Sequence, residues 1–119
     1  MKDESFSNRV DGIADKIFIE RWSPRSFISD SIPELDLKKI IDAARWSPST
    51  VNEQPWLFFT TSSDSPRFQE FVGCLNEGNQ VWAKRSAVIG FIIARKFFRY
   101  RPRENSLADF DCGAAWMAL

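Results

Sequence analysis

Two arginines and a serine alternate near the N-terminus, in the stretch RWSPRSF at residues 21–27. In an extended chain, alternate residues face the same side, so Arg21, Ser23 and Arg25 would present two guanidinium groups and a hydroxyl together. Guanidinium groups bind phosphates in bidentate fashion, and a hydroxyl adds a further donor. The stretch is therefore suited to holding a phosphate group. The alternative is a solvated surface loop with two ordinary arginines.

A second group of hydrogen-bonding residues lies in SPSTVNEQPW, residues 47–56, between a predicted helix and a predicted strand. Its serine, threonine and asparagine side chains can donate to a ligand. Pro55 and Trp56 are suited to anchoring the loop to the core. Such loops also satisfy their own hydrogen bonds through Asx or Ser turns. The residues alone leave both interpretations open.

The composition excludes several kinds of reaction. The sequence has no histidine, which rules out a Ser-His-Asp triad, a Cys-His pair and an HExxH zinc site. Cys74 and Cys112 lie far apart and form no CxxC pair, so we expect no metal site. Any chemistry must come from other side chains or from a bound cofactor.

Length and charge favour one globular domain over residues 1–119. The formal net charge of zero gives no bias toward nucleic acid or an anionic membrane. The N-terminus lacks a signal peptide, and no apolar run approaches the ~20 residues needed to span a bilayer. Two isolated cysteines suit a reducing compartment. We therefore expect a cytoplasmic protein without nucleic-acid or membrane partners.

Hydrophobic periodicity predicts the elements that position these groups. Helices are expected over residues 11–21, 33–46, 66–76 and 107–119, and strands over residues 57–61 and 87–94. Ser31 and Glu34 match a capping box at the start of the second helix. Residues 77–86 show no clear hydrophobic periodicity, so no helix or strand is predicted there.

The strand predicted over 87–94, AVIGFIIA, is continuously apolar, which is typical of a buried central strand with neighbours on both edges. The last predicted helix stops at Leu119 without a glycine, a basic residue or a polar tail. We therefore expect a chain truncated at its C-terminus, forming only part of a folding unit and marginally stable or inactive alone. The alternative is a natural C-terminal helix docked at the end of the fold.

Three motifs in order resemble the nitroreductase family of flavin-dependent oxidoreductases. The loop resembles the family pattern aPSxxNxQPW at Pro48, Ser49, Asn52, Gln54, Pro55 and Trp56. RWSPRSF resembles RRSxRxF, with Trp22 in place of the second basic residue. EGNQVWAK at 77–84 resembles GNQxW, and DFDCGAAWMAL resembles the start of the family's central helix. The resemblance spans about residues 9 to 119 and covers only the N-terminal part of family members, which are usually longer.

The resemblance implies an α+β fold with a mixed or antiparallel sheet covered by helices. It implies FMN, with hydride taken from NADH or NADPH and electrons passed to a nitroaromatic, quinone or related acceptor. Because the flavin would do the chemistry, we name no catalytic residue. A homodimer is implied, since the family's loop reaches the flavin of the other subunit. The cofactor-binding residues carried over are Arg21, Trp22, Ser23, Arg25, Pro48, Ser49, Thr50, Asn52 and Asn79.

The resemblance divides these residues between two parts of the cofactor. The RWSPR residues would bind the FMN phosphate. In the loop, Ser49, Thr50 and Asn52 would donate to the polar edge of the isoalloxazine ring, against which Pro48 would pack. Asn79 resembles a family asparagine near the flavin, and the alternative for it is a plain helix N-cap.

Other features have two interpretations. Four tryptophans could form a stacking site, although core or dimer packing is the simpler interpretation: Trp22, Trp46, Trp82 and Trp116. The basic aromatic run RKFFRYRPR, 95–103, could bind single-stranded nucleic acid, but a solvated edge or a contact with a phosphate-bearing dinucleotide fits the zero net charge better. The rival to an enzyme is a non-catalytic, truncated flavin-binding or dimeric structural remnant.

Overall fold

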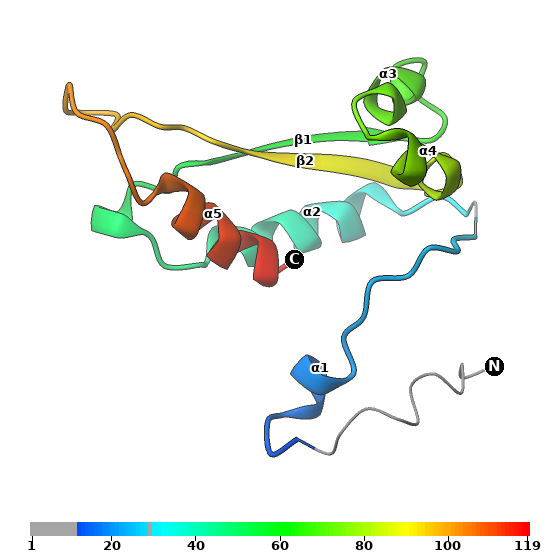
Figure 1. The fold of residues 1–119 in the computed structure, drawn as a ribbon, viewed down its shortest axis with the longest axis horizontal. Helices are drawn as coiled ribbons and strands as arrows, with labels where there is room; N and C mark the ends of the chain where they lie inside the picture. The colour runs from blue at the N-terminus through cyan, green and yellow to red at the C-terminus, as the bar shows by residue number, and fades with distance from the viewer. Residues whose placement is uncertain (1–11, 29) are drawn as a thin grey trace.

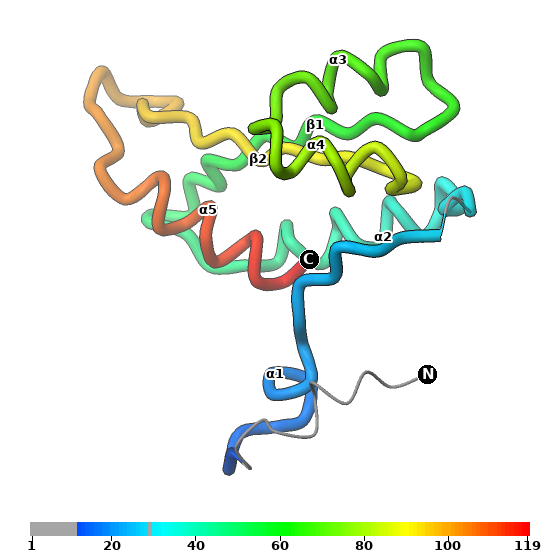
Figure 2. The backbone as a smooth tube through the Cα atoms, turned by 45° about the vertical axis from the view of Figure 1, so that its right-hand side comes forward, coloured from blue at the N-terminus to red at the C-terminus, as the bar shows by residue number. Residues whose placement is uncertain are grey.

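The computed structural model describes residues 12–28 and 30–119. Its centre is an antiparallel pair of strands, β1 (Trp56–Ser62) and β2 (Val88–Ala94). Helices α2 (Glu34–Arg45) and α5 (Ala108–Met117) lie on one side of the strands, and α3 (Phe68–Gly73) and α4 (Glu77–Ala83) lie on the other (Figure 1, Figure 2). The α+β class with an antiparallel sheet covered by helices is therefore confirmed.

The strands alternate their side chains between two small cores. The first core joins Trp56 to Ala44 of α2 and to Cys112 and Ala115 of α5. Ala44 and Ala115 are fully buried, and their small side chains let the two helices approach the strands closely. This core fixes the end of α2 and the start of β1, and so both ends of the polar loop between them.

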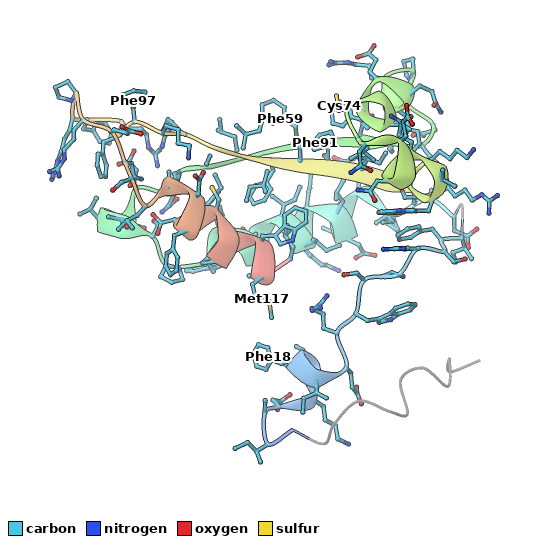
Figure 3. All side chains as sticks on the ribbon, in the orientation of Figure 1. Phe18, Phe59, Cys74, Phe91, Phe97 and Met117 are labelled. Carbon is cyan, nitrogen blue, oxygen red and sulfur yellow. The ribbon has the colours of Figure 1, made fainter. Side chains whose placement is uncertain are left out.

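The second core lies on the opposite face, under α3 and α4. It contains Phe68, Val72, Ala83 and Ile89, with the Phe71 and Phe91 rings 5.4 Å apart. Figure 3 shows Phe91 beside α3 and Phe59 farther along the strands. Toward the other end of this face, Leu57, Phe59 and Ile93 are 44%, 49% and 49% exposed. The helices therefore cover only part of this face.

The N-terminal part of the described chain stands apart from the strands. It contains one helical turn, α1 (Lys16–Ile19), followed by an extended segment that leads to α2 (Figure 1). The helix predicted over 11–21 is therefore wrong in extent, and residue 11 lies outside the described residues. Its apolar stripe is exposed at Ile13, Ile17 and Phe18. A short helix without tertiary packing is marginal, which explains the single turn.

The other elements match their predictions except in three respects. No side chain caps α2, whose N-cap is Pro33, so the capping box from Ser31 is wrong. Residues 77–83 form α4, which periodicity did not predict. Within the described residues β2 pairs with β1 alone and is largely half-buried, so the neighbours on both edges expected of a central strand are not found there, and its central position stays a prediction. Within these residues no helix is long and apolar enough to cross a membrane.

Candidate functional site

The polar loop, residues 47–55, begins where α2 ends and is anchored at its exit. Ser47 donates from its hydroxyl to the carbonyl of Ala114 in α5 at 3.2 Å. Pro55 is fully buried and Trp56 is 8% exposed. The predicted anchoring of the loop by Pro55 and Trp56 is therefore confirmed. This 47–55 loop forms one half of the candidate site.

The backbone of the 47–55 loop is strained. Val51, Asn52 and Gln54 have φ values of 49°, 56° and 49°, in the left-handed region. Asparagine tolerates this region, but a β-branched valine there is a genuine outlier. Such residues cost about 1–3 kcal/mol each and persist only where surrounding contacts hold them. Two sets of contacts from distant segments do so here.

The first set comes from Asp111 in α5, which is 4% exposed. Its carboxylate accepts from the Thr50 backbone N–H at 3.0 Å and from the Thr50 hydroxyl at 3.4 Å. A charge-assisted bond to a backbone N–H is stronger than a neutral one. Asp111 therefore ties the start of the strained segment to α5.

The second set is a cluster of Glu53, Arg95 and Arg99, which we call the Glu53 cluster. Glu53 is 7% exposed and forms ion pairs with Arg95 at 3.1 Å and Arg99 at 3.4 Å. The Arg99 backbone N–H also donates to the Glu53 carboxylate at 2.7 Å. Two cations of the basic run 95–103 are thus paired within the chain while remaining partly exposed.

The remaining polar groups of the loop are partly used among themselves. The Ser49 hydroxyl accepts from the Gln54 backbone N–H at 2.9 Å, and the Asn52 side-chain oxygen accepts from the Gln54 amide at 2.9 Å. Both donors of Thr50 are directed at Asp111. The self-satisfied turn therefore accounts for the contacts of Ser49 and Asn52, whereas the donors of Thr50 go to α5. The Asn52 side chain is exposed, and its amide nitrogen donates to none of the described residues.

The RWSPR residues lie on the extended segment between α1 and α2. Arg21, Ser23 and Arg25 are exposed, and the Arg21 guanidinium donates to the Ser23 hydroxyl at 3.4 Å. Trp22 beside them is 46% exposed. Two of the three predicted phosphate ligands therefore lie in contact on the protein surface.

The RWSPRSF and GNQxW motifs meet through their aromatic residues. The rings of Phe27 and Trp82 stack with centroids 5.7 Å apart. Asn79 lies one turn before Trp82 in α4 and is half-buried. The N-cap of α4 is Asn76, whose side chain accepts from the Asn79 N–H at 2.9 Å, so the alternative role of Asn79 as N-cap is wrong. The extended segment is thereby held against α4.

The two halves of the candidate site lie at opposite ends of α2. The RWSPR segment precedes this helix and the 47–55 loop follows it (Figure 1). The helix has 12 residues, which at the usual rise span about 18 Å. No single side chain bridges that length. The structure therefore does not bring the predicted phosphate ligands and the predicted ring ligands together within one chain.

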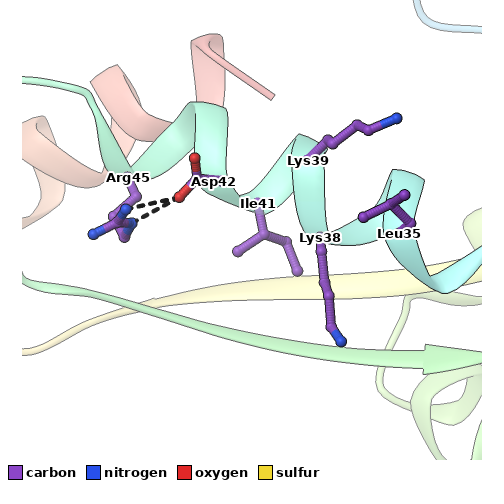
Figure 4. Close-up of a pocket in the computed structure, with 6 residues that line it drawn as sticks. All are labelled: Leu35, Lys38, Lys39, Ile41, Asp42 and Arg45. Carbon is purple, nitrogen blue, oxygen red and sulfur yellow. Dashed lines mark hydrogen bonds and ion pairs between the residues drawn. The ribbon is translucent and has the colours of Figure 1, made fainter.

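Two surface hollows flank α2, and none of the residues predicted to bind cofactor lines either of them. One, of about 470 Å³, is lined by Leu35, Lys38, Lys39, Ile41, Asp42 and Arg45 (Figure 4). In it, hydrogen bonds from Arg45 and then from Trp46 hold the pKa of the Asp42 carboxyl below its ordinary value. The other, of about 280 Å³, includes Gln54, Arg95 and Arg99. Ion pairs and exposed aliphatic groups make both shallow.

The other tryptophans and the cysteines lie outside a common site. Trp46 and Trp116 are 77% and 56% exposed, so neither is packed in the core of this chain. Both cysteines are free, with Cys74 exposed and Cys112 buried. Burial, followed by the nearby aspartates, raises the pKa of the Cys112 thiol. Among the described residues, no group of His, Cys, Asp and Glu side chains could hold a metal ion.

A model of the nitroreductase family matches residues 19–119, which include both halves of the site. The chain belongs to the nitroreductase family. A solved structure described as an oxidoreductase containing FMN is 38% identical to it, with a TM-score of 0.89 over 99% of this chain. The chain spans 61% of the length of that oxidoreductase.

Two further family-like structures share the fold at lower identity. A protein from Desulfovibrio desulfuricans, assigned as a nitroreductase and solved in complex with FMN, is 22% identical, with a TM-score of 0.63 over 79% of this chain and 52% of its own. A protein from Bacteroides thetaiotaomicron, assigned as an NADH dehydrogenase/NAD(P)H nitroreductase, is 16% identical, with a TM-score of 0.65 over 82% and 53%. No curated protein matches this nitroreductase-family sequence.

Sequence reasoning missed the residues that hold the 47–55 loop in this family member. Asp111, Glu53, Arg95 and Arg99 were not among the predicted site residues. The sequence did contain one indication of an ion pair. Glu53 is the only acidic residue within SPSTVNEQPW, and the run 95–103 carries five cations that could pair with it. Pairing them needs the register of β1 on β2, which the sequence does not state.

Proposed function

We propose that this chain is an FMN-dependent oxidoreductase that takes hydride from NADH or NADPH and passes electrons to a nitroaromatic, quinone or related acceptor. The observation that carries the proposal is the 38% identity to an FMN-containing oxidoreductase over 99% of this chain. When bound, FMN supplies the hydride chemistry, and the protein supplies binding and orientation. A reaction whose chemistry comes from the cofactor suits a chain without histidine.

The residues present fit the chemistry of FMN. Its phosphate dianion needs cations and hydroxyl donors, and Arg21, Ser23 and Arg25 offer both on an exposed extended segment. Its ring needs donors at a polar edge, and the exposed amide of Asn52 is such a donor. Pro48, in the same loop, would pack against the ring. Trp22, Ser49, Thr50 and Asn79 are retained as cofactor-binding residues under this proposal.

We further propose a homodimer in which the two halves of each flavin site come from different subunits. The separation of the halves by the length of α2 supports this arrangement, since one chain does not bring them together. Exposed Trp46 and Trp116 offer surface for association. Analytical ultracentrifugation is expected to give a flavin-loaded dimer at micromolar concentration. A flavin-loaded monomer would contradict the shared site.

A second candidate is a flavin-binding protein without turnover. It is favoured by one observation: the predicted phosphate and ring ligands lie at opposite ends of α2 and are not brought together within one chain (Figure 1). Absorbance in the flavin bands after purification is expected for both candidates. Oxidation of NADH or NADPH with menadione or nitrofurazone as acceptor separates them, because only the enzyme turns over.

The phosphate assignment is tested by Arg21→Ala and Arg25→Ala. A charge-assisted hydrogen bond contributes roughly 1.5–3 kcal/mol, so each variant is expected to weaken FMN binding by about tenfold or more. Quenching of flavin fluorescence measures the Kd. Arg67→Ala is the matched control, because Arg67 is an exposed arginine that pairs with Glu70 on α3, away from the predicted site. FMN binding equal to the parent in both test variants would remove this assignment.

A further inference from the structure

We propose that Glu53 is a positioning residue for the flavin: through Arg95 and Arg99 it fixes the strained backbone of the 47–55 loop in the shape that meets the ring. This inference rests on the proposed function. It assigns to Glu53 a role in orienting its neighbours, and not a contact with the cofactor.

Glu53 is bonded to Arg95 and Arg99 through both its carboxylate and its backbone carbonyl. One carboxylate oxygen, Oε1, accepts from the Arg99 backbone N–H, from Arg95 Nη2 and from Arg99 Nε. Its backbone carbonyl accepts from Arg99 Nη2 at 2.5 Å and from Arg95 Nη2 at 3.4 Å. Both the side chain and the main chain of Glu53 are therefore held by the same two arginines.

Because of its place in the loop, Glu53 can hold the strained backbone on both of its sides. It stands between Asn52 and Gln54, whose backbones are both left-handed. Its own φ of −69° and ψ of −26° are ordinary, so it is the fixed point between two strained neighbours. Strained conformations persist only when their surroundings over-determine them. Releasing the Glu53 cluster would let Asn52, which carries the exposed amide donors, leave its position.

The location of Arg95 and Arg99 in the fold supports a positioning role for Glu53. Arg95 and Arg99 lie 42 and 46 residues beyond Glu53, and Arg95 directly follows β2. The Arg95 backbone N–H donates to the Pro55 carbonyl at 2.8 Å, which continues the ladder of the two strands. The loop is thereby fastened to the most regular part of the fold. A connection between a helix and a strand does not need a buried carboxylate, whose desolvation is costly unless it is fully paired.

Glu53→Gln tests the proposal, because it keeps the size of the side chain and removes the charge. Glu70→Gln is the matched control, because Glu70 forms an ion pair with Arg67 on the exposed surface of α3. Arg99→Ala is a milder second variant: Arg99 is 41% exposed, and its backbone bond to Glu53 remains. It keeps the test valid if Glu53→Gln does not fold.

Two measurements separate the loop from the cofactor. Hydrogen exchange of the protein without FMN reports the loop directly, since the Asn52, Glu53 and Gln54 amides are bonded to Ser49 and Thr50. FMN titration gives the Kd, and the visible circular dichroism of the bound flavin reports the environment of its ring. If Glu53 only stabilised the fold, the dichroism at flavin saturation would stay unchanged.

We expect Glu53→Gln and Arg99→Ala to raise exchange of these amides at least tenfold, raise the Kd for FMN about tenfold and alter the visible dichroism, with Glu70→Gln unchanged. Tenfold corresponds to about 1.4 kcal/mol. Unchanged exchange overturns the fixing of the loop by Glu53. Faster exchange with parental Kd and dichroism overturns the positioning role. A parent protein that binds no FMN overturns the proposed function and this role with it, and exchange still reports whether Glu53 holds the loop.

Discussion

Replacing Asp111 tests whether the 47–55 loop is held from α5 as the structure indicates. Asp111→Ala removes a buried carboxylate that accepts from the Thr50 N–H at 3.0 Å. A hydrogen bond to a charged group contributes roughly 1.5–3 kcal/mol. The hydroxyl bond at 3.4 Å is long and adds little. We therefore expect the free energy of unfolding to fall by about 2 kcal/mol.

Asp109→Ala is the matched control, because Asp109 also lies in the first turn of α5. Both substitutions remove a negative charge from the helix N-terminus, so their effects on the helix dipole cancel in the comparison. The Asp109 side chain is 71% exposed and pairs with Lys96. Such a surface pair contributes about 0–1 kcal/mol. The difference between the variants therefore measures the contact with Thr50.

Urea denaturation followed by tryptophan fluorescence measures both free energies. We expect Asp111→Ala to be less stable than Asp109→Ala by about 1–2 kcal/mol, which corresponds to roughly 4–8 °C in Tm for a chain of this size. Asp111→Asn, which keeps one acceptor oxygen, should fall between them. Equal losses in the Asp111 and Asp109 variants would refute the inference that Asp111 holds the loop.

Three further outcomes are expected. Val51→Asn should raise the free energy of unfolding by about 1 kcal/mol in urea, because asparagine tolerates φ of 49° better than valine, and a loss of stability would contradict the strain at this position. Ellman's reagent at pH 8 should label exposed Cys74 quickly and Cys112 slowly, because burial raises the pKa of the Cys112 thiol and leaves it protonated; equal rates would contradict this burial. Phe27→Ala, but not Phe27→Leu at the same trypsin concentration, should speed cleavage in residues 20–26, because alanine removes the apolar packing on Trp82 that leucine largely keeps; equal cleavage of the alanine variant and the parent would show that another contact holds this segment.

Short-range patterns predicted most of the elements. The apolar stripe of α2 and the runs of β1 and β2 are properties of neighbouring residues, so periodicity located all three within a residue or two. The stripe near Ile13 and Ile17 has the same form, yet only one turn is helical, because these side chains are exposed and not buried by the rest of the described chain. Short α4 lacked a periodic pattern long enough to detect. Periodicity indicates which residues are apolar, but not whether a partner surface exists.

Local patterns likewise predicted only part of the candidate site. Residue types and spacing predicted an anion-binding role for Arg21, Ser23 and Arg25, which stays a prediction, and the anchoring of the loop by Pro55, which its burial confirms. They did not show that Thr50 directs both of its donors at a residue 61 positions away. A contact of this range depends on how α5 packs against the strands, which no local pattern records.

The sequence by itself determined the chemistry on offer: a chain without histidine, a polar loop with two prolines, and cations on both sides of it. Tertiary structure decided which groups are used and where. The register that sets Trp56 opposite Ala94 brings Arg95 beside Pro55 and so within reach of Glu53. A slip of one residue would turn every side chain of β2 to the other face and change the environment of Glu53. Ion pairing between distant residues follows from this packing, because it depends on distance and burial in space.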